Sequence, residues 1–321
     1  MTTAEATTEA ATEAAAAAEA AEGTEAAEAA EAAPALPFRF FDVHVVRTRL
    51  LGRSMVRITF GGPELAEFVS GGRDQRFKLF LPHPHQDVPL VPTEAGENWF
   101  AEYRAMDPDE RGIMRSYTVR AQRRDPDEVD VDFALHGAGP AAAEAGGPAS
   151  RWAARAEPGD RAILLGPVVA DNGGVDFRPP ADTDWVLITG DETALPAVAG
   201  ILEALPEGTP ARAWIEVPHA EDIQQLPTPA TAEITWLVRD RATGRRDGLV
   251  LDAVRGTDLP EGTPYAWIAG ESGTVRALRR HLTGDRGFDR TRVMFTGYWR
   301  RGATEEQLVE EAVSGTAPAD D

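Results

Sequence analysis

The sequence predicts two folded domains, an antiparallel β-barrel followed by a doubly wound parallel α/β domain. Residues 38–178 contain short segments rich in β-branched and aromatic residues, separated by turn signals and few helical stretches. After Pro179-Pro180, strand-like and helix-like segments alternate, as they do when helices cover both faces of a parallel sheet. The first 33 residues are almost entirely Ala, Glu and Thr, so they lack the large apolar side chains that a core needs.

The barrel domain is expected over residues 37–180, after a disordered low-complexity tail at 1–36. Six strands are predicted in it, at 40–48, 55–60, 77–81, 115–121, 129–136 and 161–165. The proline-containing stretch 82–113 is expected to leave the barrel as a long excursion. A short helix is predicted from Ser150 onward, with Ser150 as its N-cap.

The α/β domain is expected over residues 181–302. Its predicted strands are 185–189, 211–217, 234–238, 265–269 and 292–296, and its predicted helices are 193–205, 249–254 and 274–282. A last segment, 303–321, is expected to form a C-terminal helix over 303–314 and an acidic tail.

The formal net charge of −21 is concentrated at the two ends of the chain. The first 33 residues carry eight Glu and residues 304–321 carry six acids, both without a base, which leaves −7 for the rest. That moderate charge argues against nucleic acid or an anionic membrane as a partner. The tail lacks the basic start and apolar core of a signal peptide, and no segment approaches the roughly 18 apolar residues of a membrane helix. We expect a cytoplasmic protein that acts as a monomer.

The chain has no cysteine, which excludes disulfides, thiolate nucleophiles and cysteine-ligated iron–sulfur clusters. His83-Pro84-His85 is the only metal-like spacing. Because no further His or Cys lies nearby in the sequence, we expect no metal site.

The segment Arg115-Ser116-Tyr117-Thr118 combines residue types that a bound flavin dinucleotide requires. Arg115 supplies a cation for a pyrophosphate, Tyr117 a flat polar aromatic, and Thr118 a small hydroxyl near the redox-active edge. Alternation along a strand places Arg115 and Tyr117 on one face and Thr118 on the other. By itself the pattern also fits an ordinary exposed strand, so the rest of the chain must decide.

A second element supports the flavin interpretation. The predicted strand 129–136 ends in His136-Gly137, and the later loop Gly147-Pro148-Ala149-Ser150 opens a helix. The unpaired amides at the start of that helix are suited to a pyrophosphate. His136 alternatively fits a structural histidine at a strand end.

The segment Gly190-Asp191-Glu192-Thr193 follows the first strand of the α/β domain and starts its first helix. Ligands of open α/β sheets bind beyond the carboxyl ends of the strands, so we expect a pyridine nucleotide there. Because no Gly-x-Gly-x-x-Gly cradle is present, and because Asp191 and Glu192 would repel phosphates, the nucleotide should lie across the strand ends. Gly270-Glu271 repeat the strand-to-helix design at a later strand and are expected to face the nicotinamide.

Two further features concern the choice of nucleotide and substrate. Glu216 ends the second strand of the sheet, where a carboxylate can bind a ribose diol, and no basic cluster is evident for a 2′-phosphate, so NADH is favoured over NADPH. Tyr298 and Trp299 end the last strand and can place a ring on a flavin face, while Arg300 and Arg301 can meet an anionic substrate. The same four residues also fit a purely structural role, in which they pack between the two domains.

Together these features resemble the siderophore-interacting protein family, the flavin-dependent ferric-siderophore reductases related to the ferredoxin–NADP reductase superfamily. The likeness runs through ordered blocks between about residues 38 and 303, which begin at Phe77, Tyr103, Arg115, Asp132, Gly147, Gly190, Ala269 and Gly297. The Ala/Glu tail lies outside the resemblance. The insertion 138–146 is longer and richer in alanine than the family pattern.

The resemblance implies FAD held without a covalent bond beside a basic pocket for an anionic ferric siderophore. Electrons would pass from NADH or NADPH through the flavin to Fe(III), which would leave as Fe(II). Lys78, the single lysine among 32 basic residues, matches the lysine that the family carries near the pocket. The expected catalytic residues are Thr118 and Trp299, and the expected substrate contacts are Lys78, Arg300 and Arg301. The expected cofactor contacts are Arg115, Ser116, Tyr117, Thr118, His136, Ala149, Ser150, Gly190, Asp191, Glu192, Thr193, Glu216, Gly270, Glu271, Tyr298 and Trp299.

Two other functions stay open at the level of the sequence. One is a general NAD(P)H:flavin or ferredoxin-type reductase, in which ferredoxin is the electron partner. The other is a siderophore-binding carrier with a structural flavin and no turnover, which the unusual Asp191-Glu192 loop motivates.

Overall fold

The computed structural model describes residues 36–135, 147–242 and 248–304, together with 307, 310, 311 and 314. The chain divides after Pro37 into two units, and the fold described below belongs to the second, Phe38–Asp321. Residues 1–35 of the predicted tail, the predicted cofactor residue His136 and half of the predicted C-terminal helix lie outside the described residues.

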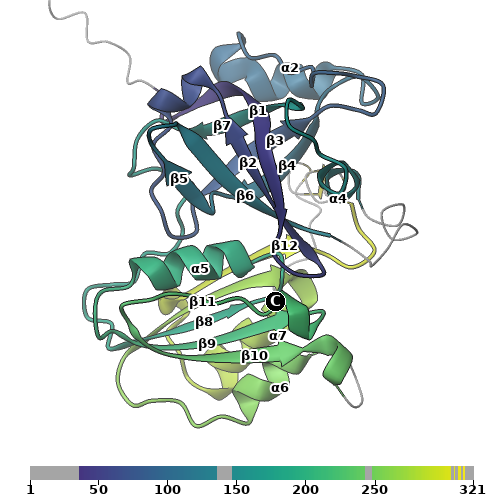
Figure 1. The fold of residues 1–321 in the computed structure, drawn as a ribbon. Helices are drawn as coiled ribbons and strands as arrows, with labels where there is room; N and C mark the ends of the chain where they lie inside the picture. Colours follow the sequence, from purple (N-terminus) through teal and green to yellow (C-terminus); the bar gives the residue numbers. More distant parts are fainter. Residues whose placement is uncertain are drawn as a thin grey trace, which may run out of the picture. The chain divides into compact units, whose positions relative to one another are not determined.

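Seven strands form one antiparallel sheet in the order β4-β3-β7-β1-β2-β6-β5 (Figure 1). They are β1 (Phe38–Leu50), β2 (Met55–Gly61), β3 (Arg76–Leu81), β4 (Ile113–Thr118), β5 (Ala121–Arg123), β6 (Glu128–Ala134) and β7 (Arg161–Pro167). Alternate residues of β1, among them Phe41, Val43 and Val45, are buried in a core enclosed by the curled sheet. This arrangement confirms the predicted antiparallel barrel domain.

The two edges of this sheet belong to one continuous segment of chain. β4 pairs with β3, whereas β5, only two residues later, pairs with β6. At the bend between them the Arg120 amide donates to the Asp130 carbonyl at 2.9 Å. The segment therefore bridges the open side and nearly closes the barrel. The prediction of one uninterrupted strand over 115–121 is wrong at its C-terminal end, because β4 stops at Thr118 and Ala121 begins β5.

The helix that follows the barrel's sixth strand begins earlier than predicted. α4 (Pro148–Ala153) has Gly147 as its N-cap, with no side chain bonded to the cap. Pro148 suits the first turn because its fixed φ is already helical. The N–H that proline lacks would have no acceptor within the helix at this position. Ser150 therefore lies inside the first turn, and the prediction that Ser150 is the N-cap is wrong.

The excursion between β3 and β4 contains a helix that the sequence analysis did not predict, α2 (Trp99–Ala105). Its Trp99 and Tyr103 rings meet the Phe80 ring edge-on, with centroids 6.0 and 5.6 Å away. These contacts form a second small core, which also includes Met114 of β4. The excursion is thereby anchored against the two strands that carry Lys78 and Arg115.

Five parallel strands form the second sheet in the order β10-β9-β8-β11-β12. They are β8 (Trp185–Gly190), β9 (Pro210–Val217), β10 (Thr231–Val238), β11 (Pro264–Glu271) and β12 (Val293–Trp299). Val186 and Ile188 of β8 pack with α5 (Leu195–Ala204), whereas Trp185 and Leu187 pack with α6 (Leu249–Arg255) and α7 (Ser272–Arg280) (Figure 1). Both faces of the sheet are covered, which confirms the predicted doubly wound domain and each of its predicted strands and helices.

The strand order fixes where this sheet can hold a ligand. β9 and β10 lie on one side of β8, and β11 and β12 lie on the other, so the topology switches between β8 and β11. Connections leave these two strands in opposite directions and open a crevice at their carboxyl ends. In the described ranges no helix has the length and apolar character that crossing a membrane requires.

Candidate functional site

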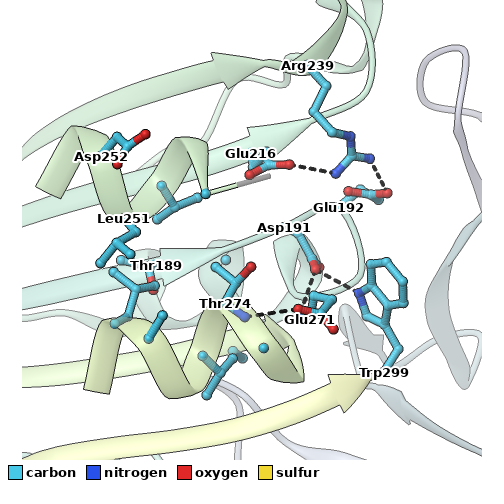
Figure 2. Close-up of a pocket in the computed structure, with 18 of the residues that line it drawn as sticks. Thr189, Asp191, Glu192, Glu216, Arg239, Leu251, Asp252, Glu271, Thr274 and Trp299 are labelled. Carbon is cyan, nitrogen blue, oxygen red and sulfur yellow. Dashed lines mark hydrogen bonds and ion pairs between the residues drawn. The ribbon is translucent and has the colours of Figure 1, made fainter. Parts of the chain in front are cut away.

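A cavity of about 720 Å³ lies at the carboxyl ends of β8, β9 and β11, at the topological switch point. Figure 2 shows the side chains that line it. Thr189 to Glu192 come from the end of β8, Glu216 from β9, Glu271 from β11 and Trp299 from β12, while α6 and α7 supply the opposite wall. The volume lies within the range of sites that hold drug-sized and cofactor ligands.

Asp191 ties three strand ends together within this cavity. Its Oδ1 accepts hydrogen bonds from the amide and the hydroxyl of Thr193, at 2.9 and 2.5 Å. Its Oδ2 accepts from the Glu271 amide at 2.9 Å and from the Trp299 indole Nε1 at 2.8 Å (Figure 2). These four bonds occupy the carboxylate, so its negative charge is already stabilised by donors before any phosphate approaches.

Two further acids at the cavity, Glu192 and Glu216, share one cation. Arg239 donates through Nη1 to Glu216 Oε1 at 3.0 Å and through Nη2 to Glu192 Oε1. Glu192 and Glu216 are only 5 and 9 % exposed. Burial raises the pKa of both carboxyls, and the nearby charge of Asp191 raises that of Glu192 further, while Arg239 opposes the rise. The hydrogen bonds to both acids outweigh burial and raise the pKa of Arg239 itself.

Sequence reasoning missed Arg239, although a signal was present. Arg239 directly follows β10, and the carboxyl end of β10 lies at the same sheet edge as those of β8 and β9. A charged residue at that position in the chain is placed to reach the cavity.

Two buried polar atoms in the cavity wall have no protein partner within the part of the chain that the structure describes. They are Oγ1 of Thr189, which is 1 % exposed, and Oε2 of Glu192. Buried polar atoms nearly always have a hydrogen-bond partner. Their position suggests that a polar ligand completes the cavity.

Two of the remaining predicted nucleotide residues, Gly190 and Glu271, line the cavity, and all three that follow also shape it. Gly270 has φ +132°, and a Cβ there would lie 2.6 Å from Asp191 Oδ2, so the close approach of β8 and β11 requires glycine. Gly190 similarly leaves room for Ala194 at the start of α5. Glu271 accepts from the Thr274 amide at 2.9 Å and caps α7.

The predicted flavin segment lies in β4 with the two faces that alternation predicts. Tyr117 turns toward the barrel core, where its ring centroid is 4.4 Å from that of Phe133. Thr118 is buried on the other face, next to the hydroxyl of Tyr298, whose pKa burial raises. Arg115 donates to the Met114 carbonyl at 2.7 Å.

The residues predicted around the flavin pyrophosphate lie in α4, which contacts β4. Ala149 and Ser150 occupy the first turn of α4, where the amides lack acceptors within the helix. Trp152 is buried and stacks on Phe60 with centroids 6.2 Å apart, so it belongs to the core. Arg115, Tyr117 and the start of α4 therefore offer the cation, the aromatic ring and the amides that FAD requires.

The structure separates the three residues predicted to contact substrate. Lys78 of β3 lies opposite Ser116 of β4 and donates to its Oγ at 2.7 Å, so it is a neighbour of the flavin segment. Arg300 makes two 2.7 Å hydrogen bonds to Glu311. Arg301 lines the α/β cavity together with Trp299.

A β-barrel with flavin-type residues on one strand, joined to a doubly wound domain with a cavity at its switch point, defines a two-domain flavin-dependent oxidoreductase. The model of the siderophore-interacting FAD-binding domain matches residues 44–171, and that of the siderophore-interacting protein matches residues 183–302. The chain belongs to the siderophore-interacting protein family.

Similar proteins include two curated reductases and a solved structure. The ferric vibriobactin reductase ViuB of Vibrio cholerae is 30 % identical over 83 % of this chain and 91 % of ViuB. The NADPH-dependent ferric-chelate reductase of Escherichia coli is 29 % identical over 81 % of this chain and 93 % of that protein. The crystal structure of the siderophore-interacting protein SipS from Aeromonas hydrophila is 32 % identical, with a TM-score of 0.68 over 88 % of this chain and 99 % of SipS.

Proposed function

We propose that this protein is an NADH-dependent ferric-siderophore reductase. The observation that carries the proposal is the cavity at the carboxyl ends of β8, β9 and β11, on a chain that also contains an FAD-binding domain. Among the described residues, Thr189 Oγ1 and Glu192 Oε2 in the cavity wall have no hydrogen-bond partner. The names of ViuB and of the Escherichia coli relative support ferric chelates as the electron acceptors. We propose the cytoplasm as the compartment of this reaction.

The barrel domain would hold FAD through residues that suit its parts. Arg115 provides the charge that a pyrophosphate needs, Tyr117 an aromatic face, and the amides of Ala149 and Ser150 further donors. His136 remains a predicted contact. The chemistry that bound FAD would supply is uptake of a hydride from NADH and delivery of its two electrons, one at a time, to two Fe(III) ions. Hard siderophore oxygens bind Fe(II) less tightly than Fe(III), so reduction favours iron release.

The adenosine end of the cavity favours NADH over NADPH. Glu216 lies at the end of β9, where a carboxylate can accept hydrogen bonds from the two ribose hydroxyls. Arg239 is the cation that contacts Glu216, so a 2′-phosphate at the same place would compete for it. Because Arg239 is already bonded to two buried carboxylates, transferring it to a phosphate would leave Glu192 and Glu216 without a cation.

Lys78 is the residue we propose for attraction of the ferric siderophore. Its ammonium bonds Ser116 of the flavin segment and lies on the strand next to Arg115. A compact cation beside the flavin would draw an anionic iron complex toward the electron donor. Arg300 is less suited because Glu311 neutralises it.

Steady-state turnover with several acceptors tests the proposal. We expect NADH oxidation that depends on ferric siderophore, two Fe(II) trapped per NADH consumed, and a higher kcat/KM with NADH than with NADPH. No iron-dependent NADH oxidation would refute ferric-siderophore reduction. Faster turnover with ferredoxin than with any ferric chelate would favour the general reductase, and a higher kcat/KM with NADPH would refute the role given to Glu216 and Arg239.

A further inference from the structure

We propose that Asp191 is a positioning residue that fixes the indole ring of Trp299 as the wall of the cavity at its nicotinamide end. The inference rests on the proposed function, because it assigns one end of the cavity to the nicotinamide. It gives a defined role to an acid that the sequence analysis expects to contact the nucleotide although its charge would repel phosphates.

A bulge in the second sheet aims Trp299 into the cavity. In the β11–β12 pairing Gly270 lies opposite Gly297, but Glu271 lies opposite Trp299, so Tyr298 is an extra residue in β12. Bulges of this kind re-aim the neighbouring side chains. Tyr298 accordingly meets Thr118 of the barrel domain, while Trp299 lines the cavity.

Trp299 is held at two points. Its carbonyl accepts a hydrogen bond from Ser272 Oγ at 2.9 Å, which fixes the backbone at the end of β12. Its Nε1 donates to Asp191 Oδ2 at 2.8 Å, which fixes the rotation of the ring (Figure 2). The backbone anchor does not by itself set the χ angles of the half-buried indole, so the bond to Asp191 selects among its rotamers.

Asp191 can set the ring because the carboxylate is itself held in place. Thr193 binds Oδ1 through two donors, and the Glu271 amide shares Oδ2 with the indole. Rotating the carboxylate toward any other position would break bonds to both β11 and the start of α5. Gly270 allows this approach, since a Cβ at that position would collide with the carboxylate.

The direction of the nucleotide places Trp299 next to the reacting ring. The ribose acid Glu216 and Arg239 mark the β9–β10 side of the cavity, whereas Glu271 and Trp299 mark the β11–β12 side. A dinucleotide with its adenosine at the first side has its nicotinamide at the second. The contact between Tyr298 and Thr118 links that side to the predicted flavin segment. A fixed indole there would restrict the nicotinamide to the geometry from which hydride transfer is fast.

The chain offers a matched control in a second buried acid bonded to an indole. Asp74 Oδ2 accepts from Trp267 Nε1 at 2.9 Å and also from the Phe177 amide. Neither Asp74 nor Trp267 is among the described residues that line the cavity. Asp74→Asn therefore perturbs a similar bond without touching the nucleotide.

The first measurement needs no turnover. In protein labelled with 15N-tryptophan, loss of one indole resonance in Trp299→Phe identifies Trp299. We expect the exchange of that indole proton with water to be roughly tenfold faster in Asp191→Asn, because an amide cannot accept from both donor pairs. In Asp74→Asn the Trp299 exchange rate should not change. Unchanged exchange in Asp191→Asn would overturn the proposal.

The second measurement separates the two half-reactions in an anaerobic stopped-flow experiment. We expect Asp191→Asn and Trp299→Phe each to slow flavin reduction by NADH roughly tenfold, and the double variant to be no slower than the single ones. Flavin reoxidation by ferric siderophore should keep its wild-type rate in all three. Trp299→Phe leaves Asp191 and its other donors in place, so it remains informative if the Asn variant does not fold.

Effects that multiply in the double variant, or equal slowing of both half-reactions, would show that Asp191 does not act through Trp299. Wild-type flavin that NADH does not reduce would refute the proposed function instead. In that case the exchange measurement would still decide whether Asp191 holds the indole.

Discussion

Replacing Arg239 with methionine tests the electrostatics of the cavity most sharply. Methionine keeps much of the side-chain volume but removes the cation that Glu192 and Glu216 share. Both carboxylates then remain buried in a wall that also contains Asp191. The variant should therefore fold less stably than the wild type.

The size of the expected stability loss follows from the burial of the ion pairs that Arg239 makes. Removing one partner of a buried ion pair costs about 3–5 kcal/mol. Because the Arg239 side chain is 24 % exposed, water can partly reach the site, and we expect about 2–4 kcal/mol. For a domain of this size such a loss lowers Tm by about 5–15 °C.

The stability loss in Arg239→Met should become smaller as the pH falls. Burial raises the pKa of Glu192 and Glu216 above the value of 4.5 that each has when unfolded. A carboxyl with a raised folded pKa costs stability while it is charged, and protonation removes that cost as the pH falls through the folded pKa toward the unfolded one. Without Arg239 both carboxyls should titrate higher still, so the Tm difference from wild type should shrink between about pH 8 and pH 5.

Thermal unfolding at the two pH values measures this effect, and a second variant checks its cause. Adding Glu192→Gln and Glu216→Gln to Arg239→Met removes both unpaired charges and should restore most of the lost Tm. An equal Tm loss at both pH values, or no recovery in the triple variant, would refute the reasoning.

Four further variants test the flavin site, the substrate site and the stability of the barrel. Arg115→Ala should weaken FAD binding by about 1–3 kcal/mol through loss of a charge-assisted phosphate contact, and an unchanged Kd in a fluorescence titration would count against its role. Lys78→Ala should leave FAD bound but raise KM for an anionic ferric siderophore, whereas an unaltered KM would mean that Lys78 does not attract the substrate. Arg123→Ala removes one partner of each of two buried acids, Glu128 and Asp130, and should cost about 2 kcal/mol in urea unfolding. Arg47→Ala, at a half-exposed arginine on the same Glu128, should cost less than 1 kcal/mol, roughly the value of a surface pair, and equal losses would contradict this ranking.

Hydrophobic patterning was sufficient to find six of the seven strands of the first sheet and all five strands of the second. The strand around Val186 and Ile188 is buried on both faces, and its continuous apolar run is typical of a parallel sheet. In β1 the alternation of Phe41, Val43 and Val45 with polar residues is typical of a barrel wall. These signals are local, so a sequence without relatives still shows them.

The features that the sequence did not reveal depend on which segments of the chain contact one another in the fold. The run from Arg115 to Ala121 has uniform strand propensity, yet its two halves pair with different strands, and periodicity carries no information about partners. Ser150 has the chemistry of an N-cap, but Pro148 moved the helix start. Arg239 became a site residue only because β10 pairs in parallel with β9, which carries Glu216.

The reoxidation of reduced flavin tests the central claim most directly. The purified protein, loaded with FAD and photoreduced without oxygen, is mixed with ferric siderophore in the presence of a coloured Fe(II) chelator. We predict rapid return of the oxidised flavin spectrum, with two Fe(II) trapped per flavin. A flavin that stays reduced after the ferric siderophore is added would contradict the account and would leave a carrier with a structural flavin as the better explanation.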